Sequence, residues 1–360
     1  MTTIYFYGID NNKGGIENYS LNLIRGIINN SNEFKFHIIT EYENFAFKDI
    51  FVNQLKCQYT VIPNKKKHPF RYYKTLKNIL TQKSPNDLLQ LNIMSYRNFL
   101  LFKAAKKSKI KTIIVGHANN SNNIINKAVH YFFRLFYKNF GSKIANNSSV
   151  RNFLYSSKNK YVEIIELGIN KEKFSFNPQI RNEIRDQLGC ENNFVIGQIG
   201  RICKAKNQNF SLKVMSLLKN NTNISLFLIG NESSSNIKKK INKMNLKNVY
   251  FLGEKTNISD YYNSFDLFIF PSLFESAGFA LYEATSNGLY SLTSKNIPLE
   301  NITLNKSKQL ELKPKIWAKE IQKILNTGYE REKNTSLIPT LDNQINKYLN
   351  FYLKLTKNFK

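Results

Sequence analysis

The sequence predicts an α/β protein with two domains, each a parallel sheet covered by helices. The chain has 360 residues, and a single hydrophobic core rarely serves more than about 250–300. Apolar runs of strand length alternate with segments of helical periodicity, which is typical of doubly wound parallel sheets. The alternation occurs in two successive series of similar size. We therefore expect two Rossmann-like domains, over residues 1–170 and 171–341.

The first series opens directly with an apolar, aromatic run and continues in strand–helix order. Helices are expected near residues 15–28, 72–80 and 97–107, where apolar residues recur with helical spacing. The expected strands are "TIYFYG", "KFHIIT", "YTVIP", "DLLQLN" and "KTIIVG".

The second series repeats this order after a junction near residues 166–185. Helices are expected near residues 209–218, 235–244 and 277–287. Residues 342–360 form an amphipathic, basic segment that predicts a final helix. The expected strands are "NFVIGQIG", "SLFLIG", "VYFLG", "DLFIF" and "LYSLTS".

The charge is strongly positive and unevenly distributed. The chain has 53 Lys and Arg against 25 Asp and Glu, a formal charge of +28. Residues 51–150 hold 18 basic residues and a single acid, Asp87. A field of this sign attracts anionic partners such as nucleic acid, lipid headgroups or phosphorylated substrates. Compositional drift toward Lys and Asn explains part of the excess, but not the loss of acids from one segment.

Cysteine content and hydropathy suggest a cytoplasmic protein. The three cysteines, Cys57, Cys190 and Cys203, are too scattered for a disulfide framework or a C-x-x-C metal site. The first residues show no signal-peptide pattern, and no apolar run reaches the roughly 18 residues that a membrane helix needs.

Two glycines follow the first strand of the first series, and two cations follow the first strand of the second series. Gly14 and Gly15 stand where a loop meets a helix N-terminus, which suits phosphate or sugar oxygens, although an ordinary turn has the same pattern. In "IGRICKAKN", Arg201 and Lys206 follow a strand and can neutralise a diphosphate, or form a solvated basic loop. The G-x-G-x-x-G and G-K-[ST] patterns are absent, which argues against a nicotinamide enzyme and a nucleoside triphosphatase.

Two glutamates stand eight residues apart in "PSLFESAGFALYEA". Glu275 lies on the loop after a strand, and Glu283 lies on the next helix. The backbone N–H groups of residues 276–279 are expected to point into the same crevice and to favour phosphate. Each carboxylate can accept hydrogen bonds from a pair of sugar hydroxyls. Taken alone, such a pair also fits an exposed helix face.

The order and spacing of these motifs resemble the family 4 retaining glycosyltransferases of GT-B fold. "GRICKAKNQNF", "SLFLIG", "VYFLG" and "PSLFESAGFALYEA" are similar to the second domain of that family. "GGIENY", "IIVGHANNSNN" and "VEIIELGINKEKF" are similar to its first domain, in the capsular and exopolysaccharide branch. The resemblance implies two Rossmann-like domains that face each other across a cleft, with the C-terminal helix, about 342–360, packed back on the first domain.

The resemblance also implies a reaction and its residues. A hexose or N-acetylhexosamine moves from a nucleotide-sugar, expected to be a UDP-sugar, to a lipid-linked oligosaccharide or other glycan with retained configuration, in capsule, exopolysaccharide or O-antigen synthesis. The catalytic residues implied are Glu275, His117, Arg201 and Lys206, and the nucleotide-sugar contacts are Gly15, Arg201, Lys206, Gly278, Phe279 and Glu283.

No metal or other cofactor is expected. The sequence lacks the D-x-D pattern of metal-dependent glycosyltransferases, and two cations with a helix N-terminus can balance the diphosphate charge instead. Three positions depart from the family pattern and leave the sugar undetermined: Ala277 between the glutamates, "NGLY" after them, and "DLLQLN", which lacks a His pair.

The basic first domain suggests contact with the anionic inner face of the plasma membrane, through "KKKHPFRYYKTLK" and "NKAVHYFFRLFYKNF". The second stretch can equally be a helix whose aromatic residues belong to the core.

Three other functions stay open: a non-catalytic scaffold subunit of the same fold, a nucleic-acid binder, which rests on charge alone, and a sugar-nucleotide epimerase, for which acid–base carboxylates are missing.

Overall fold

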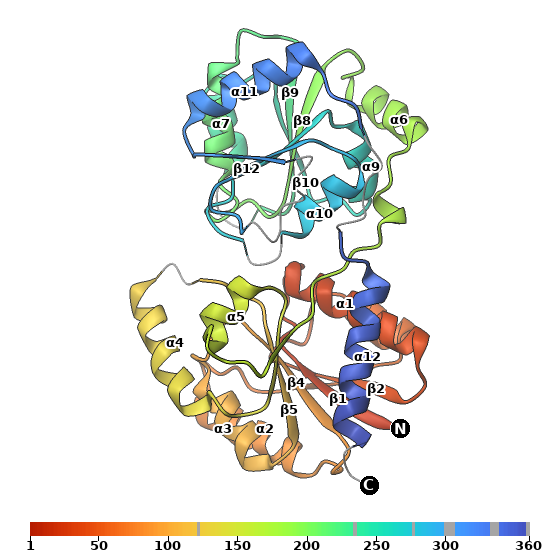
Figure 1. The fold of residues 1–360 in the computed structure, drawn as a ribbon, viewed down its shortest axis with the longest axis vertical. Coiled ribbons are helices and arrows are strands. Elements are labelled where there is room, and N and C mark those ends of the chain that lie inside the picture. The colour runs from red at the N-terminus through yellow and green to blue at the C-terminus, as the bar shows by residue number, and fades with distance from the viewer. Residues whose placement is uncertain (121–122, 233–235, 276–277, 299–306, 332–337, 358–360) are drawn as a thin grey trace. The chain divides into compact units, whose positions relative to one another are not determined.

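The computed structural model describes residues 1–120, 123–232, 236–275, 278–298, 307–331 and 338–357. The chain forms two compact units. The first comprises Met1–Gly168 together with Leu341–Lys360, and the second comprises Ile169–Thr340. Each unit contains one parallel sheet with helices on its faces (Figure 1). The prediction of two Rossmann-like domains is confirmed.

The first unit has a seven-stranded sheet in the order β3-β2-β1-β4-β5-β6-β7. Its neighbouring strands pair in parallel, so their carboxyl ends share one edge. The strands are β1 (Thr2–Tyr7), β2 (Phe34–Thr40), β3 (Gln58–Val61), β4 (Leu88–Ile93), β5 (Lys111–Gly116), β6 (Ser142–Ala145) and β7 (Val162–Ile164).

Helices cover both faces of this sheet. Buried residues of α2, α3 and α5 form one core with β4 and β5, whereas α1 and α12 pack together on the other side (Figure 1). The helices are α1 (Gly15–Asn30), α2 (Pro69–Thr81), α3 (Phe99–Ser108), α4 (Ile124–Tyr137), α5 (Ser148–Tyr155) and α12 (Leu341–Lys357), with a short π-helix at Ile50–Gln54.

The second unit has a six-stranded sheet in the order β10-β9-β8-β11-β12-β13, with parallel pairing between its strands. Successive residues of its strands enter opposite cores: Leu226 and Leu228 face one, Phe227 and Ile229 the other. The strands are β8 (Phe194–Ile199), β9 (Ile224–Ile229), β10 (Val249–Gly253), β11 (Leu267–Phe270), β12 (Ser291–Ser294) and β13 (Ser307–Leu310).

The helices of the second unit separate into two layers. Buried residues of α7, α8 and α11 fill one core, and those of α6, α9 and α10 fill the other. The helices are α6 (Pro178–Leu188), α7 (Gln208–Leu217), α8 (Ile237–Lys243), α9 (Ile258–Ser264), α10 (Phe279–Ser286) and α11 (Pro314–Thr327), with a 3₁₀ turn at Glu172–Phe174.

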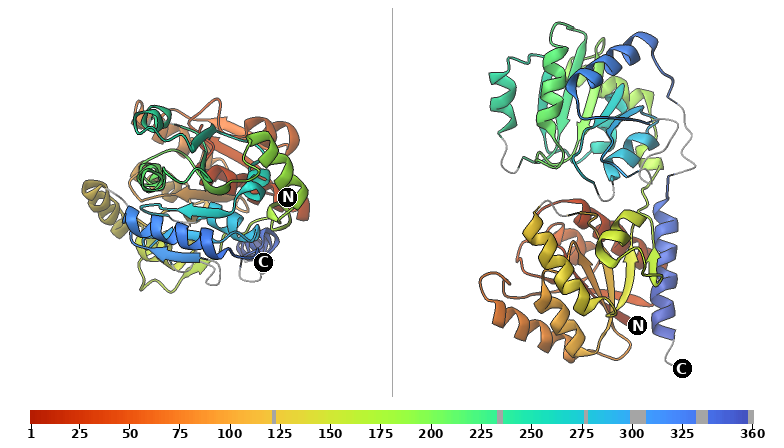
Figure 2. Two further views of the ribbon diagram at one scale, coloured as in Figure 1. Left: turned by 90° about the horizontal axis from the view of Figure 1, so that it is seen from above. Right: turned by 60° about the vertical axis from the view of Figure 1, so that its left-hand side comes forward.

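The C-terminal helix α12 belongs to the first unit, and it runs along that unit as the dark blue helix of Figure 2. Tyr348 and Tyr352 are fully buried there. The hydroxyl of Tyr19 on α1 donates to the Tyr348 hydroxyl at 2.7 Å. The expected packing of this helix on the first domain is therefore observed.

Candidate functional site

The strand order of the second sheet places two loops side by side. Chain order reverses between β8 and β11, which are hydrogen-bonded neighbours. Ligands of open parallel sheets bind beside the carboxyl ends of the strands at such a reversal. Residues 200–207 follow β8 and residues 271–275 follow β11. Both sequence motifs singled out above therefore emerge at this one point.

Hydrogen bonds hold the two loops together. The N–H of Leu273 donates to the carbonyl of Ala205 at 2.8 Å. The side-chain amide of Asn207 donates to the carbonyl of Pro271 at 3.1 Å, and Asn207 has a left-handed backbone, with φ 58°. These bonds link the β8 loop to the β11 loop.

Lys206 and Glu275 form an ion pair across the two loops. The Lys206 Nζ lies 2.5 Å from the Glu275 Oε1, and the side chains are 22% and 13% exposed. The same ammonium lies 4.9 Å from the ring centroid of Phe270, the last residue of β11. Gly200 permits this position: a Cβ there would lie 3.3 Å from the Lys206 side chain. A cation is thus held at the carboxyl end of the sheet, next to a carboxylate.

Glu283 is oriented by a buried tyrosine on a neighbouring helix. The Tyr262 hydroxyl on α9 donates to the Glu283 Oε2 at 2.8 Å. Burial raises the pKa of Tyr262 well above its usual value, so the phenol stays protonated and keeps its donor. Burial also raises the pKa of Glu283, while Tyr262, Lys173 and Lys206 oppose that shift. Glu283 therefore lies within the field of the Lys206 cation.

The remaining candidates of this unit surround the pair less closely. Arg201 follows Gly200 and is exposed, and its side chain makes no hydrogen bond or ion pair within the described ranges. Gly278 is the N-cap of α10 with φ 70°, and Phe279 is the first residue of that helix. The predicted N–H contributions of Ser276 and Ala277, and the departure at Ala277, lie outside the described residues. The helix begins two residues later than the sequence suggested.

His117 lies one strand away from the corresponding reversal of the first sheet, which falls between β1 and β4. It directly follows β5, is 6% exposed, and its Nε2 lies 3.0 Å from the Asn92 Oδ1. The Asn92 amide donates to the Tyr7 carbonyl at 3.0 Å, so three strand ends are linked. Burial lowers the pKa of His117 to about 3. The imidazole is therefore neutral at physiological pH, and its Nε2 is assigned as the donor to Asn92.

Gly15 is exposed as the first residue of α1, and a Cβ built on it meets no atom within 4 Å. Gly14 precedes it as the N-cap in extended backbone conformation. The loop after β1 is therefore open on the side of Gly15. This openness is compatible with a ligand approaching the backbone, and it is equally compatible with a solvated helix start.

Sequence reasoning missed four residues that act on the candidates through hydrogen bonds or charge. Tyr262 and Lys173 act on Glu283, and Gln90 and Asn92 form the polar network beside His117. Gln90 and Asn92 stand in "DLLQLN", where a departure from the family pattern was noted. Their alternation on a strand of otherwise apolar residues was the available signal. No sequence signal pointed to Tyr262 or Lys173, because they come near Glu283 only through tertiary packing.

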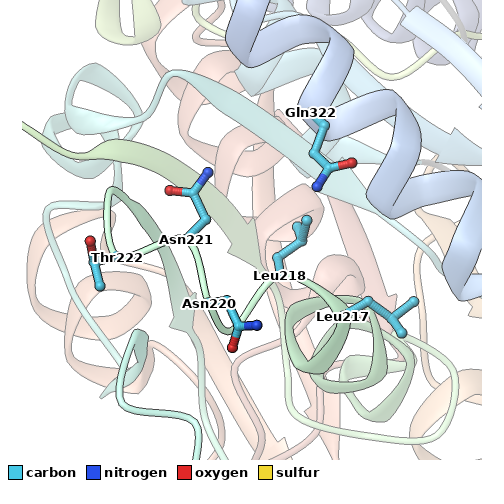
Figure 3. A pocket seen from close by; sticks show the side chains of 6 residues that line it. All are labelled: Leu217, Leu218, Asn220, Asn221, Thr222 and Gln322. Carbon is cyan, nitrogen blue, oxygen red and sulfur yellow. The ribbon is translucent and has the colours of Figure 1, made fainter.

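A polar pocket of about 470 Å³ lies elsewhere on the second unit (Figure 3). Asn220, Asn221 and Thr222 line it from the segment before β9, and Gln322 lines it from α11. This segment lies at the amino edge of the sheet, opposite the carboxyl edge that bears Lys206 and Glu275. Its lining contains no charged residue, so we assign it no part in the candidate site.

Comparison with known proteins supports a class for the chain. Residues 180–338 match the family model "Glycosyl transferases group 1". The capsular polysaccharide biosynthesis glycosyltransferase CapH of Staphylococcus aureus is 27% identical over 335 residues, covering 88% of each chain. The structure of Anabaena Alr3699/HepE in complex with UDP and glucose superposes with a TM-score of 0.80, at 16% identity over 98% of this chain and 99% of that one.

A glycosyltransferase from Rickettsia africae has a similar structure, with a TM-score of 0.79 at 17% identity over 99% of each chain. The second unit thus contains a glycosyltransferase group 1 domain, and the fold is that of GT-B glycosyltransferases. Together these findings show that the chain is similar to glycosyltransferases in sequence and has the fold of the GT-B glycosyltransferases.

Proposed function

We propose that this protein transfers a hexose or N-acetylhexosamine from a UDP-sugar to a lipid-linked oligosaccharide or other glycan, with retention of configuration. One observation carries the proposal: Lys206, Glu275 and Glu283 converge at the strand-order reversal of the second sheet. The capsular relative and the UDP-bound neighbour support the reaction class. We place the reaction in the synthesis of capsule, exopolysaccharide or O-antigen.

Each candidate then has a distinct role at the donor. Lys206 and Arg201 offset the negative charge that builds on the diphosphate as the glycosidic bond breaks. Glu283, held by Tyr262, accepts hydrogen bonds from the ribose hydroxyls. Glu275 contacts the hydroxyls of the donor sugar, and its ion pair with Lys206 keeps both groups in place.

We propose a separate role for each backbone candidate and for each candidate of the first unit. The N–H groups of Gly278 and Phe279, at the start of α10, contact the phosphates. Gly15 lets the α1 loop approach the diphosphate. His117 remains neutral, so it serves the sugar or the acceptor as a hydrogen-bonding group rather than as a cation.

The test is a panel of UDP-, GDP- and ADP-sugars, assayed for binding by calorimetry and for turnover with a lipid-linked acceptor extract. We expect one nucleotide-sugar to bind and be consumed. Glu283→Ala should weaken binding roughly 10- to 100-fold, because a hydrogen-bonded charged group contributes about 1.5–3 kcal/mol. The control is Glu320→Gln, since Glu320 is a paired carboxylate of the same unit that lies outside the site.

Two results would contradict the proposal in different ways. If no nucleotide-sugar binds to the wild type, the donor site is wrong. If one binds but is never transferred, and Lys206→Ala binds it equally well, a non-catalytic scaffold of the same fold is the better description.

Transfer without a divalent ion is part of the proposal. Lys206, Arg201 and the start of α10 supply the positive charge that a metal provides in other transferases. We expect turnover to continue in excess EDTA at more than half of its normal rate. Loss of activity in EDTA, restored by Mg²⁺ or Mn²⁺, would show that the cations do not suffice.

We also propose a peripheral position on the anionic inner face of the plasma membrane. No helix of the described residues is long and apolar enough to cross a bilayer. Helix α4 instead turns its most apolar residues outward: Phe132, Leu135 and Phe136 are 56–63% exposed. Its inward side carries the buried His130 and Tyr137. Phe133 and Tyr137 do pack in the core, as the alternative for this stretch predicts. Phe132 and Phe136 do not.

Charge complementarity selects an anionic bilayer for this α4 face. Lys127 lies on the helix and Lys138 directly follows it, within the 51–150 segment of net charge +17, whereas Arg134 donates to the Phe153 carbonyl. A basic residue near an anionic surface contributes about 1 kcal/mol, and a buried Phe or Leu contributes about 1.5–3 kcal/mol. Phe132→Ser with Phe136→Ser should abolish flotation with phosphatidylglycerol vesicles. Tyr161→Ser, another exposed aromatic of the unit, is the control. Equal flotation with neutral vesicles would overturn the proposal.

A further inference from the structure

A buried carboxylate lies beneath the glycine loop of the first unit. Glu17 is in the first turn of α1 and is only 6% exposed. Its Oε1 accepts a hydrogen bond from the backbone N–H of Asp10 at 3.4 Å. The Glu17 Oε2 would lie 2.8 Å from a Cβ on Gly14. The group therefore touches the loop that we propose for the diphosphate.

The charges around Glu17 make this position unusual. A second carboxylate, Asp10, lies in the same loop and raises the pKa of Glu17 together with burial, to about 7. No basic side chain pairs with Glu17 in the part of the chain that the structure describes. Lys13, the basic residue of the loop, lies over the ring of Phe47 at 5.6 Å.

The segment after β2 brings no cation to the group either. It packs on the loop through a bond from the Ala46 N–H to the Asp10 carbonyl, at 2.8 Å. Its Tyr42 has a raised pKa, caused by burial and by Asp10 and Glu41, so it stays neutral. A phosphate that reached this loop would meet two carboxylates and no compensating charge among these neighbours.

We infer that Glu17 is a proton-coupled residue of the Gly14–Gly15 loop: it takes up one proton when a diphosphate binds there. This inference rests on the proposed function, because it assumes that a nucleotide-sugar contacts the loop. The protonated carboxyl group can donate to a phosphate oxygen, whereas the ionised group repels it. Proton uptake and donor binding are then reciprocally linked.

A purely structural role for Glu17 is the alternative. A glutamate at the third helical position commonly accepts from the N-cap N–H, as in a capping box. Such a cap predicts lower stability without Glu17, but it predicts no exchange of protons on ligand binding. Proton exchange therefore separates the two interpretations.

The sign of the linkage follows from the pKa of Glu17, which burial and Asp10 raise to about 7. Below about pH 6 the group is protonated with or without ligand, so it adds no pH dependence. Above about pH 7 it is ionised in the free protein and must gain a proton on binding. Donor affinity should then fall about tenfold per pH unit. A nucleotide-sugar is the right probe because its pyrophosphate is a diester, which lacks the second phosphate pKa near 6 of a terminal phosphate.

The experiment is calorimetry of the full-length protein with the tightest-binding sugar nucleotide of the panel, at pH 6–9 and in buffers of different ionisation enthalpy. The wild type should take up close to one proton at pH 8. Glu17→Gln keeps the shape and an acceptor oxygen, and it should bind with no proton uptake and nearly constant affinity. Asp10→Asn removes the neighbouring charge and should move the midpoint of the pH dependence to lower pH.

The outcomes distinguish this inference from the function on which it rests. Binding by the wild type without proton uptake, or equal uptake in Glu17→Gln, overturns the role of Glu17 and leaves the proposed function standing. Failure of every sugar nucleotide to bind overturns the proposed function and this inference with it.

Discussion

At the scale of single residues, Gly230 explains why the Lys206 loop has its shape. It follows β9 with φ 151°, and a Cβ there would lie 2.2 Å from the carbonyl oxygen of Gly200. Gly200 itself has φ 145° and leaves room for the Lys206 stem. The two glycines thus let adjacent strand ends approach each other directly beneath the candidate site.

We expect Gly230→Ala to lower the free energy of unfolding by about 3 kcal/mol or more, because backbone strain and overlap with Gly200 act together. Gly189→Ala is the matched control: Gly189 has φ 60° but open space around its Cβ position, so only the conformational cost of about 1–2 kcal/mol remains. Urea unfolding measures both. Equal losses would show that the Gly200 contact is unimportant.

At the scale of helices and strands, the contact between α1 and α12 ties the chain's last helix to the first unit. A Cβ on Gly26 of α1 would lie 2.0 Å from the Ile345 Cδ1 on α12. The two helices therefore pack at a distance that depends on this glycine, and Ile345 is 3% exposed.

Gly26→Ala should destabilise the first unit because the added methyl group overlaps Ile345. Ile345→Ala alone should cost about 2–5 kcal/mol through the cavity it leaves. In the double variant the new methyl group occupies part of that cavity, so the combined loss should be smaller than the sum by about 0.5–3 kcal/mol. Thermal unfolding of the four proteins measures this coupling, and strict additivity would argue against the contact.

At the scale of the whole molecule, the two units should respond differently to acid. All four histidines lie in the first unit. Burial lowers the pKa of His117 to about 3 and that of His130 to about 4. Both values lie below the usual 6.5, so their neutral forms contribute stability above pH 6.5. That stability is lost as the pH falls toward 3–4, at about 1.4 kcal/mol per pH unit for each proton.

Glutamates with raised pKa values act in the opposite direction. The pKa of Glu17 is raised to about 7, so this group stabilises the folded first unit as the pH falls from 7 to 4.5. This gain offsets the stability that is lost through one of the two histidines. In the second unit, the raised pKa of Glu283 adds stability on acidification, and no histidine opposes it. The first unit should therefore unfold at a higher pH than the second.

The chain's single tryptophan makes this measurable. Trp317 is fully buried on α11 of the second unit, so its fluorescence reports on that unit alone, whereas far-UV circular dichroism reports on both. We expect a circular dichroism transition between about pH 5 and 3 before the Trp317 emission shifts. Coincident transitions would show that the units unfold together.

Much of the fold could be predicted because it depends on local patterns. Apolar runs such as "SLFLIG" are long enough to mark buried strands, and the helices after Gly15 and near residue 209 begin within a residue of their predicted starts. The short strand β13, "SKQL", is polar and could not be recognised. Helix α9 was also missed, since its seven residues are too few to show a period.

The sequence by itself determined the parallel sheets, the two-unit organisation and the two loops that bear Lys206 and Glu275, because strand runs and their flanking motifs are local in the chain. Only the tertiary structure decided the protonation state of His117 and the burial of Glu17 beside Asp10. It also decided the hydrogen bond from Tyr262 to Glu283 and the outward direction of Phe132 and Phe136. These properties depend on desolvation and on contacts between residues far apart in sequence, which no local pattern encodes.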